Sequence, residues 1–278
     1  MFTRNDQGRS LRYKGHGMTK DVFDNAKGIM IMKNFTLEVC VDTLESAKAA
    51  INGGATRLEL CSNLVIGGTS PSPQLLSQIR KISDIPIRAM LRPRFGDFCY
   101  TDSEFDIMRW ELEEFTKAGT TGVVFGILSP DGTLDMKRMK TLCDDAKGMD
   151  KTLHRAFDVA KDPFETLAQA NELGMNTILT SGQQANAWTG RKLIADLVKK
   201  ADGIEILAGA GVKTDNIATI HHETGCTSFH LSGKIVIDSP MVFRRDEVKM
   251  GLPSLSEFER WQTDAMAVSA AREVLEKL

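Results

Sequence analysis

The chain has 278 residues, of which 42% are hydrophobic and 26% charged, a composition typical of one large globular domain or two small ones. Its 35 basic side chains nearly balance 37 acidic ones, so the net charge of -2 excludes a general electrostatic affinity for nucleic acid. No segment approaches the roughly 18 consecutive apolar residues of a transmembrane helix. We therefore expect neither nucleic acid nor a membrane as a partner.

The five cysteines are odd in number and widely spaced, which fits neither a disulfide framework nor a zinc ribbon. They predict free thiols in a reducing compartment, and hence a cytoplasmic protein. Residues 1–33 are rich in Lys and Arg and lack the apolar run of a secretory signal. We expect residues 1–33 to be a poorly ordered leader and residues 34–278 to form one domain.

From residue 36 onward, short β-rich runs alternate with helical patterns. The expected strands are Thr36–Val41, Arg57–Ser62, Ile85–Arg92, Gly122–Leu128, Lys151–Phe157, Thr177–Ser181, Ile204–Ala208 and Ser228–Ser232. The expected helices are Thr43–Asn52, Pro73–Ile82, Ser103–Ala118, Met136–Ala146, Pro163–Leu173, Arg191–Lys200, Asp215–Glu223 and about Leu255–Leu278. Eight such pairs predict an α/β fold, a (β/α)8 TIM barrel in a single domain with a C-terminal helix. The alternative is a doubly wound open sheet, which rarely needs eight regular units; its GxGxxG fingerprint is missing after the first strand.

Alternation along each expected strand separates an apolar face from a polar face. The outer face of a barrel packs under its helices and must be apolar, so the polar face points into the barrel. The residues expected inside are Glu38, Glu59, Arg88, Arg92, His154, Glu205 and His230. Such charges either neutralise one another in a space-filling network or line a functional pocket at the carboxyl ends of the strands, and we favour the pocket.

The loops after the last three expected strands contain glycine, in Thr180–Gly182, Gly209–Gly211 and Ser232–Lys234. Glycine lets backbone N–H groups approach an anion, and the loops after strands seven and eight of a barrel often hold a phosphate, although glycine also simply forms turns. Arg94 adds a cation at the same end of the barrel. The residues expected to bind a small anionic ligand are Arg88, Arg92, Arg94, Ser181, Gly182, Gly209, Gly211, His230 and Ser232.

Several longer motifs are more specific. The segments LEVCVDTLESAKAAINGGATRLELCSNLVIGGTSPS, MLRPRFGDFCYTDSEF, LHRAFDVAKDP, LTSGQ and FHLSG occur in this order. Together they resemble the CutC family of copper homeostasis proteins over residues 35–234. The resemblance implies a cytoplasmic (β/α)8 barrel that handles copper and forms a homo-oligomer, a dimer or a tetramer.

The resemblance also implies copper ligands. Two cysteines on the first two strands have been put forward for the family, and they correspond to Cys40 and Cys61 here. Adjacent strands lie about 4.8 Å apart, so two inward thiolates suit the soft ion Cu(I). Buried cysteines are also commonly small hydrophobic residues, which leaves the metal role open.

Two functions from different classes follow. In the first, the chain is a copper homeostasis protein that binds Cu(I) through Cys40 and Cys61. In the second, it is a hydrolase or isomerase that acts on a small anionic or sugar-like substrate, with an indirect link to copper. Its acid or base is then one of Glu38, Glu59 and Glu205, with His154 as a further acid–base group.

Overall fold

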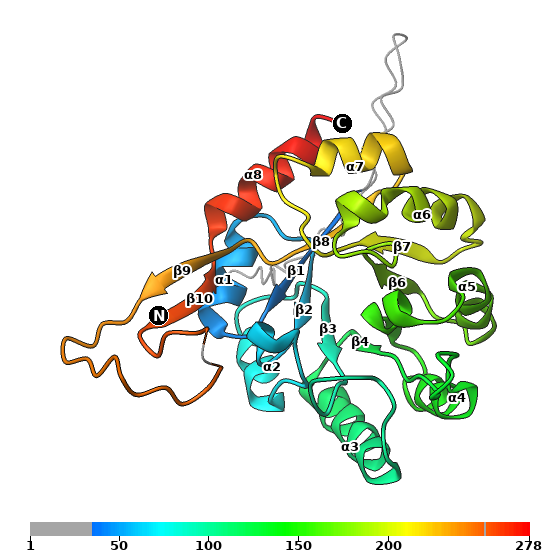
Figure 1. The fold of residues 1–278 in the computed structure, drawn as a ribbon, viewed down its shortest axis with the longest axis horizontal. Helices are drawn as coiled ribbons and strands as arrows, with labels where there is room; N and C mark the ends of the chain where they lie inside the picture. The colour runs from blue at the N-terminus through cyan, green and yellow to red at the C-terminus, as the bar shows by residue number, and fades with distance from the viewer. Residues whose placement is uncertain (1–34, 253) are drawn as a thin grey trace, which may run out of the picture. The chain divides into compact units, whose positions relative to one another are not determined.

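A computed structural model describes residues 35–252 and 254–278, and the expected leader at residues 1–33 lies outside them. Eight parallel strands close into a barrel in chain order, with β8 returning to pair with β1. Figure 1 shows the barrel inside a ring of helices, which confirms the predicted (β/α)8 fold. The strands are β1 (Thr36–Val41), β2 (Arg57–Leu60), β3 (Ile87–Met90), β4 (Gly122–Phe125), β5 (Asp150–Leu153), β6 (Thr177–Thr180), β7 (Glu205–Ala208) and β8 (Ser228–Leu231).

Most of the surrounding helices begin at a side chain that caps the first turn, because an oxygen there accepts an otherwise free backbone N–H group. At the start of α3, Thr101 and Glu104 form a reciprocal capping box. The helices are α1 (Leu44–Asn52), α2 (Pro73–Arg80), α3 (Asp102–Ala118), α4 (Met136–Asp145), α5 (Pro163–Glu172), α6 (Ala187–Lys200), α7 (Ile217–Thr224) and α8 (Ala265–Glu276), with short turns η1 (Leu64–Ile66) and η2 (Arg155–Val159). None of the described helices combines the length and apolar character that crossing a bilayer requires.

The two faces of β1 divide as the alternation predicts, whereas the expected fifth strand ends at Leu153 and continues as η2, which brings Arg155 to the cavity instead of the outer face. Leu37, Val39 and Val41 of β1 are completely buried in the core beneath the helices. The intervening polar residues point into the barrel, where Arg57 of β2 reaches past β1 and β8 to Glu205 of β7. The interior of the barrel is therefore polar, and its chemistry depends on how these side chains pair.

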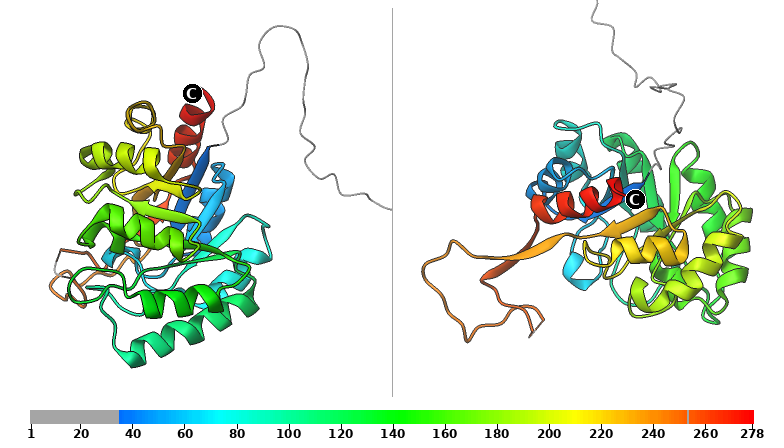
Figure 2. Two further views of the ribbon diagram at one scale, coloured as in Figure 1. Left: turned by 90° about the vertical axis from the view of Figure 1, so that its right-hand side faces the viewer. Right: turned by 90° about the horizontal axis from the view of Figure 1, so that it is seen from above.

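The chain after β8 differs from the expectation. Strand β9 (Lys234–Asp238) pairs antiparallel with β10 (Glu259–Thr263), and Figures 1 and 2 show this hairpin projecting from the barrel. The prediction of a helix from about Leu255 is therefore wrong for its first part, and α8 begins only after the capping residue Asp264. The spacing of apolar residues near Trp261 imitates a helix, but the partner strand lies some twenty-five residues earlier in the chain.

Candidate active site

The polar interior has two layers, and the lower one lies near the amino ends of the strands. Arg57 Nε is 2.5 Å from Glu38 Oε2, and Arg57 Nη1 is 3.1 Å from Glu205 Oε2. Arg88 Nη1 is 3.7 Å from Glu205 Oε2 and donates hydrogen bonds to two threonine hydroxyls. In this layer carboxylates and guanidinium groups neutralise one another, as buried charges must.

This pairing removes two carboxylates from the candidate acids and bases. Burial by itself raises the pKa of Glu38, but Arg57 and His230 outweigh it and lower the pKa to about 2. Burial also raises the pKa of Glu205, but the attraction of Arg57 outweighs this effect and lowers the pKa. Both groups stay ionised and bound to cations. Arg57 was not singled out in the sequence, although it occupies the same face of its strand as Glu59.

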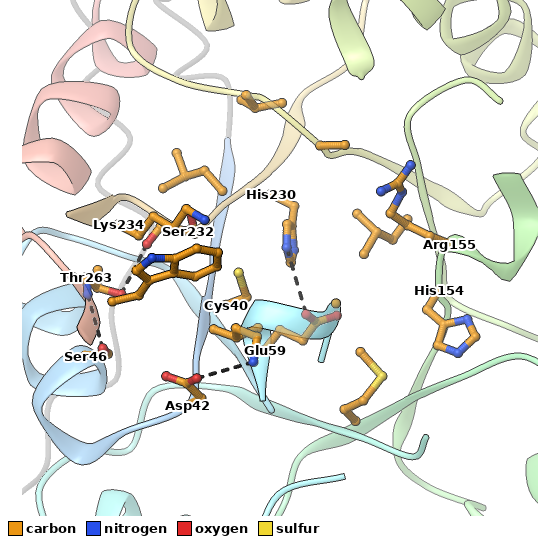
Figure 3. Close-up of a pocket in the computed structure, with 18 of the residues that line it drawn as sticks. Cys40, Asp42, Ser46, Glu59, His154, Arg155, His230, Ser232, Lys234 and Thr263 are labelled. Atoms are coloured by element: carbon orange, nitrogen blue, oxygen red, sulfur yellow. Dashed lines mark hydrogen bonds and ion pairs between the residues drawn. The ribbon is translucent and has the colours of Figure 1, made fainter. Parts of the chain in front are cut away.

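Above this layer a cavity of about 500 Å³ opens at the carboxyl ends of the strands, shown in Figure 3. A cavity of this size suits a small organic molecule. Seven of the residues singled out from the sequence line it: Cys40, Glu59, Arg92, His154, Gly211, His230 and Ser232.

Glu59 and His230 lie on one side of the cavity. His230 Nδ1 is 2.8 Å from Glu38 Oε1, and its Nε2 is 3.9 Å from Glu59 Oε2. Burial lowers the pKa of His230, but its interactions with Cys40 and Glu59 and its hydrogen bond to Glu38 raise it well above its usual value. Burial raises the pKa of Glu59 and outweighs the attraction of His230, which lowers it. The second oxygen of this carboxyl group, Glu59 Oε1, is buried without a hydrogen-bond partner.

His154 faces the cavity from the opposite side in Figure 3. It follows directly after β5, and its Nδ1 accepts a hydrogen bond from the Ala156 backbone N–H at 3.2 Å. The ring proton therefore belongs on Nε2, which is buried without a partner. Burial and the nearby Arg92 charge lower the pKa of His154 to about 3. A neutral imidazole thus offers an N–H donor to a ligand.

Besides His230, three basic side chains line the same cavity: Arg92, Arg155 and Lys234. Arg92 Nη1 donates to the carbonyls of Gly67 and Gly68, so this guanidinium also holds the loop after β2. Neither Arg155 nor Lys234 was among the ligand residues expected from the sequence. Arg155 directly follows His154, and Lys234 ends the glycine-containing segment Ser232–Lys234, and those positions were the available signals.

Arg155 is held by two residues behind the cavity wall. Its Nε lies 2.7 Å from Asp158 Oδ2, and its Nη2 donates to Ser181 Oγ at 3.0 Å. Ser181 also donates to Asp158, so the hydroxyl supports a cavity residue and does not line the cavity itself.

Four other expected ligand residues also lie outside the cavity lining, and one of them is Arg88, which pairs with Glu205 in the lower layer. Arg94 pairs with Glu104 at 2.6 Å and with Asp97 at 2.9 Å, and so ties the loop after β3 to α3. A Cβ atom on Gly182 would lie 2.2 Å from a backbone oxygen of α6, and one on Gly209 would lie 2.5 Å from a leucine side chain. These two glycines allow close packing. The ligand roles of these four residues find no support in this geometry.

The two cysteines of the first strands differ in their surroundings. Cys40 lines the cavity next to His230, and the strand register places it opposite Glu59. Cys61 is completely buried in an apolar cluster with Met90, and its thiol donates to Glu59 Oε2 at 3.5 Å. Burial and the Glu59 charge raise the pKa of the Cys61 thiol well above its usual value. Only Cys40 of the pair faces the cavity directly.

One group within the described residues has the spacing of metal ligands, namely Glu38, Glu59 and His230, whose ligand atoms lie within 4.8 Å of one another. It contains no cysteine, and two carboxylates with an imidazole suit a harder ion than Cu(I). Glu38 and His230 already bind each other, and Glu38 also binds Arg57. Internal pairing thus accounts for two of the three candidate ligands.

The fold and this pocket define a (β/α)8 barrel with convergent polar groups at the carboxyl ends of its strands. Comparison with known proteins agrees with the family resemblance seen in the motifs. Residues 35–235 match the model of the CutC family, and the chain belongs to that family.

Relatives match the chain over most of its length. A CutC family protein of Vibrio campbellii is 43% identical over 85% of this chain and 97% of its own, and one of Parabacteroides distasonis is 45% identical over 84% and 98%. The crystal structure of a CutC protein from Streptococcus agalactiae, assigned provisionally to copper homeostasis, is 30% identical, with a TM-score of 0.68 over 71% of this chain and 98% of that one. Thiamine phosphate pyrophosphorylase of Pyrococcus furiosus is 14% identical with a TM-score of 0.53, a likeness of fold alone.

Proposed function

We propose that the chain is an enzyme that carries out acid–base catalysis on a small anionic molecule in the barrel cavity. One observation carries this proposal: Glu59 Oε1 and His154 Nε2 are buried without partners, and both residues line the same cavity. A buried polar atom without a hydrogen bond costs roughly 1–3 kcal/mol. A ligand removes this cost if the surrounding side chains shift enough for it to pair with both atoms.

The two groups have complementary chemistry. The Glu59 carboxyl group takes up or releases a proton, because burial raises its pKa toward the working range of an acid–base catalyst. The neutral His154 donates a hydrogen bond from Nε2 to an oxygen on which negative charge develops. Arg92, Arg155 and Lys234 supply positive charge that attracts an anionic molecule. This set suits a hydrolase or an isomerase.

Turnover by a matched pair of variants tests the proposal. The protein is incubated with a panel of small phosphorylated and carboxylated metabolites, and their consumption is followed by proton NMR. Glu59→Gln should lower turnover by roughly 100-fold or more, because it removes the titrating group and keeps its shape. The control, Glu172→Gln on the exposed side of α5, should leave the rate unchanged. Equal rates for wild type and Glu59→Gln, or no consumption of any compound by wild type, contradict the proposal.

Cu(I) binding in copper homeostasis is a second candidate, and the position of Cys40 favours it. The thiol of Cys40 lies in the cavity within hydrogen-bonding contact of His230, and sulfur and imidazole are both suitable ligands for Cu(I). Cys61, behind Glu59, would supply a second thiolate only after it loses its proton. Copper homeostasis is also the role assigned provisionally to the Streptococcus agalactiae relative.

An anaerobic Cu(I) titration against a competing chelator tests this candidate. Tight stoichiometric binding should be lost in Cys40→Ser and in the double variant with Cys61→Ser. The control is Cys143→Ser, which alters a buried cysteine of α4. Weak binding, or binding that is equal in Cys40→Ser and wild type, contradicts it.

Location and assembly are further parts of the proposal. We propose a cytoplasmic protein because all five cysteines are free thiols, as a reducing compartment maintains them. The dimer or tetramer implied by the family resemblance stays a prediction, which light scattering in solution would test.

A further inference from the structure

The loops after β7 and β8 form one wall of the cavity. Ala210, Gly211 and Val212 of the first loop line it, and so does Ser232 of the second. Among the described residues, the backbone N–H groups of all four donate to no protein acceptor, and neither does the Ser232 hydroxyl. The two loops, which lie far apart in the sequence, therefore hold five hydrogen-bond donors that no protein acceptor occupies.

The first loop also has an unusual backbone. Ala210 has a φ of 68°, in the left-handed region that glycine favours, and Gly211 follows it with a φ of 74°. A non-glycine residue in this region is strained, and such conformations cluster at ligand sites. The strain is consistent with a loop shaped for binding.

Positive charge accompanies these donors. Lys234 follows Ser232 by two residues, lines the cavity, and is held with its Nζ 3.0 Å from the centre of the Trp261 ring. Arg155 lines the cavity as well, fixed by Asp158. Three basic side chains, those of Arg92, Arg155 and Lys234, lie on the cavity wall with two carboxyl groups, those of Asp42 and Glu59, so the wall favours an anion.

The number of donors selects the type of anion. A carboxylate has two oxygens, whereas the terminal phosphate of a monoester has three and carries up to two negative charges. Four N–H groups, one hydroxyl and one ammonium group match the phosphate better. The loops after strands seven and eight are also where barrels of this fold frequently bind phosphate.

We propose that the substrate is a phosphate monoester, whose phosphate binds to the β7–α7 and β8–β9 loops and Lys234 and whose organic part extends toward Glu59 and His154. This inference rests on the enzyme proposed above and names its substrate class. The cavity of about 500 Å³ has room for both parts of such a molecule.

Calorimetric titration with inorganic phosphate, methyl phosphate and acetate tests the site without any turnover. Both phosphates should bind at least roughly tenfold more tightly than acetate. Ser232→Asp should weaken phosphate binding by at least roughly tenfold, because it places a negative charge among the donors. Ser232→Asn introduces a side chain of the same size as aspartate but without its charge, and should change the affinity for phosphate much less.

A charge reversal at an exposed position provides a second variant, whose result does not depend on whether the protein folds with a substitution at position 232. Lys234→Glu should also weaken phosphate binding by at least roughly tenfold. The control is Lys213→Ala, since Lys213 belongs to the β7–α7 loop but pairs with Asp215 at 3.0 Å and does not line the cavity. It should bind phosphate as wild type does.

Three results would overturn the proposal: phosphate bound no better than acetate, no detectable phosphate binding, or phosphate affinity unchanged in both Ser232→Asp and Lys234→Glu. The Glu59→Gln variant separates this test from that of the enzyme function, because it should still bind phosphate. If phosphate binds as expected but turnover is indifferent to Glu59→Gln, the acid–base function fails and the phosphate site stands. If Glu59→Gln loses turnover and phosphate does not bind, the phosphate site alone fails.

Discussion

Replacement of Glu38 by glutamine tests whether the lower polar layer stabilises the barrel. The Glu38 side chain is completely buried and lies between two cationic partners, Arg57 Nε at 2.5 Å and His230 Nδ1 at 2.8 Å. Glutamine keeps the shape of the side chain and removes its negative charge. Arg57 is then left with Glu205 as its ion-pair partner.

The expected loss of stability follows from the pKa of Glu38. Its partners lower this pKa from 4.5 to about 2. At about 1.4 kcal/mol for each pH unit, the ionised carboxylate stabilises the folded state by about 3 kcal/mol. A carboxyl group with a lowered pKa gives this stability in full at neutral pH and loses it as the pH falls toward the folded-state value. Roughly half should remain near pH 3.

Urea unfolding at about pH 7, 5 and 3, followed by circular dichroism, measures this effect. Glu38→Gln should lower the free energy of unfolding by about 3 kcal/mol at pH 7, and the difference from wild type should shrink as the pH falls. The control, Glu172→Gln on the exposed side of α5, should change it by less than about 0.5 kcal/mol. A loss below about 1 kcal/mol at pH 7, or a loss that grows at lower pH, would refute this account of the layer.

Three further predictions concern packing and titration. Alanine usually stabilises a helix relative to glycine. Gly190→Ala should nevertheless lower the free energy of unfolding by on the order of 3 kcal/mol, because the added Cβ would lie 1.8 Å from the Ser181 carbonyl oxygen. Thermal unfolding measures this effect, and a raised Tm would contradict it. The imidazole of His154 should stay neutral between about pH 5 and 8, since burial lowers its pKa to about 3; an NMR titration midpoint near 6.5 would contradict that environment. In the native protein, iodoacetamide should modify the partly exposed Cys99 well before Cys61, because burial raises the pKa of the Cys61 thiol. Equal rates of modification at the two cysteines, measured by peptide mass spectrometry, would contradict this burial.

Much of the fold could be predicted because its signals are local. Each strand alternates side chains with a period of two residues, so the burial of Leu37 and Val39 beneath the helices and the inward direction of Glu38 follow from adjacent positions. The repeated strand–helix pattern then predicts a closed barrel. The same reasoning placed Glu59 and His154 inside, and the motifs identified the family.

The hairpin of β9 and β10 shows where local signals fail. Val236 pairs with Trp261, so neither strand is stable without a partner some twenty-five residues away. The segment around Trp261 has helical spacing by itself, and only the antiparallel pairing makes it a strand. The position of Lys234 on the cavity wall depends on that pairing too.

The sequence by itself determined the barrel, its polar interior and the family. Only the tertiary structure decided which of the inward charges neutralise one another and which face a ligand. Arg57 and Glu205 are 148 residues apart in the chain yet lie 3.1 Å apart across the barrel, whereas Glu59 and His154 each keep a buried polar atom without a partner. Alternation along a strand fixes the face on which a side chain lies. Its height along the barrel axis and its partner across the barrel depend on the closure of all eight strands.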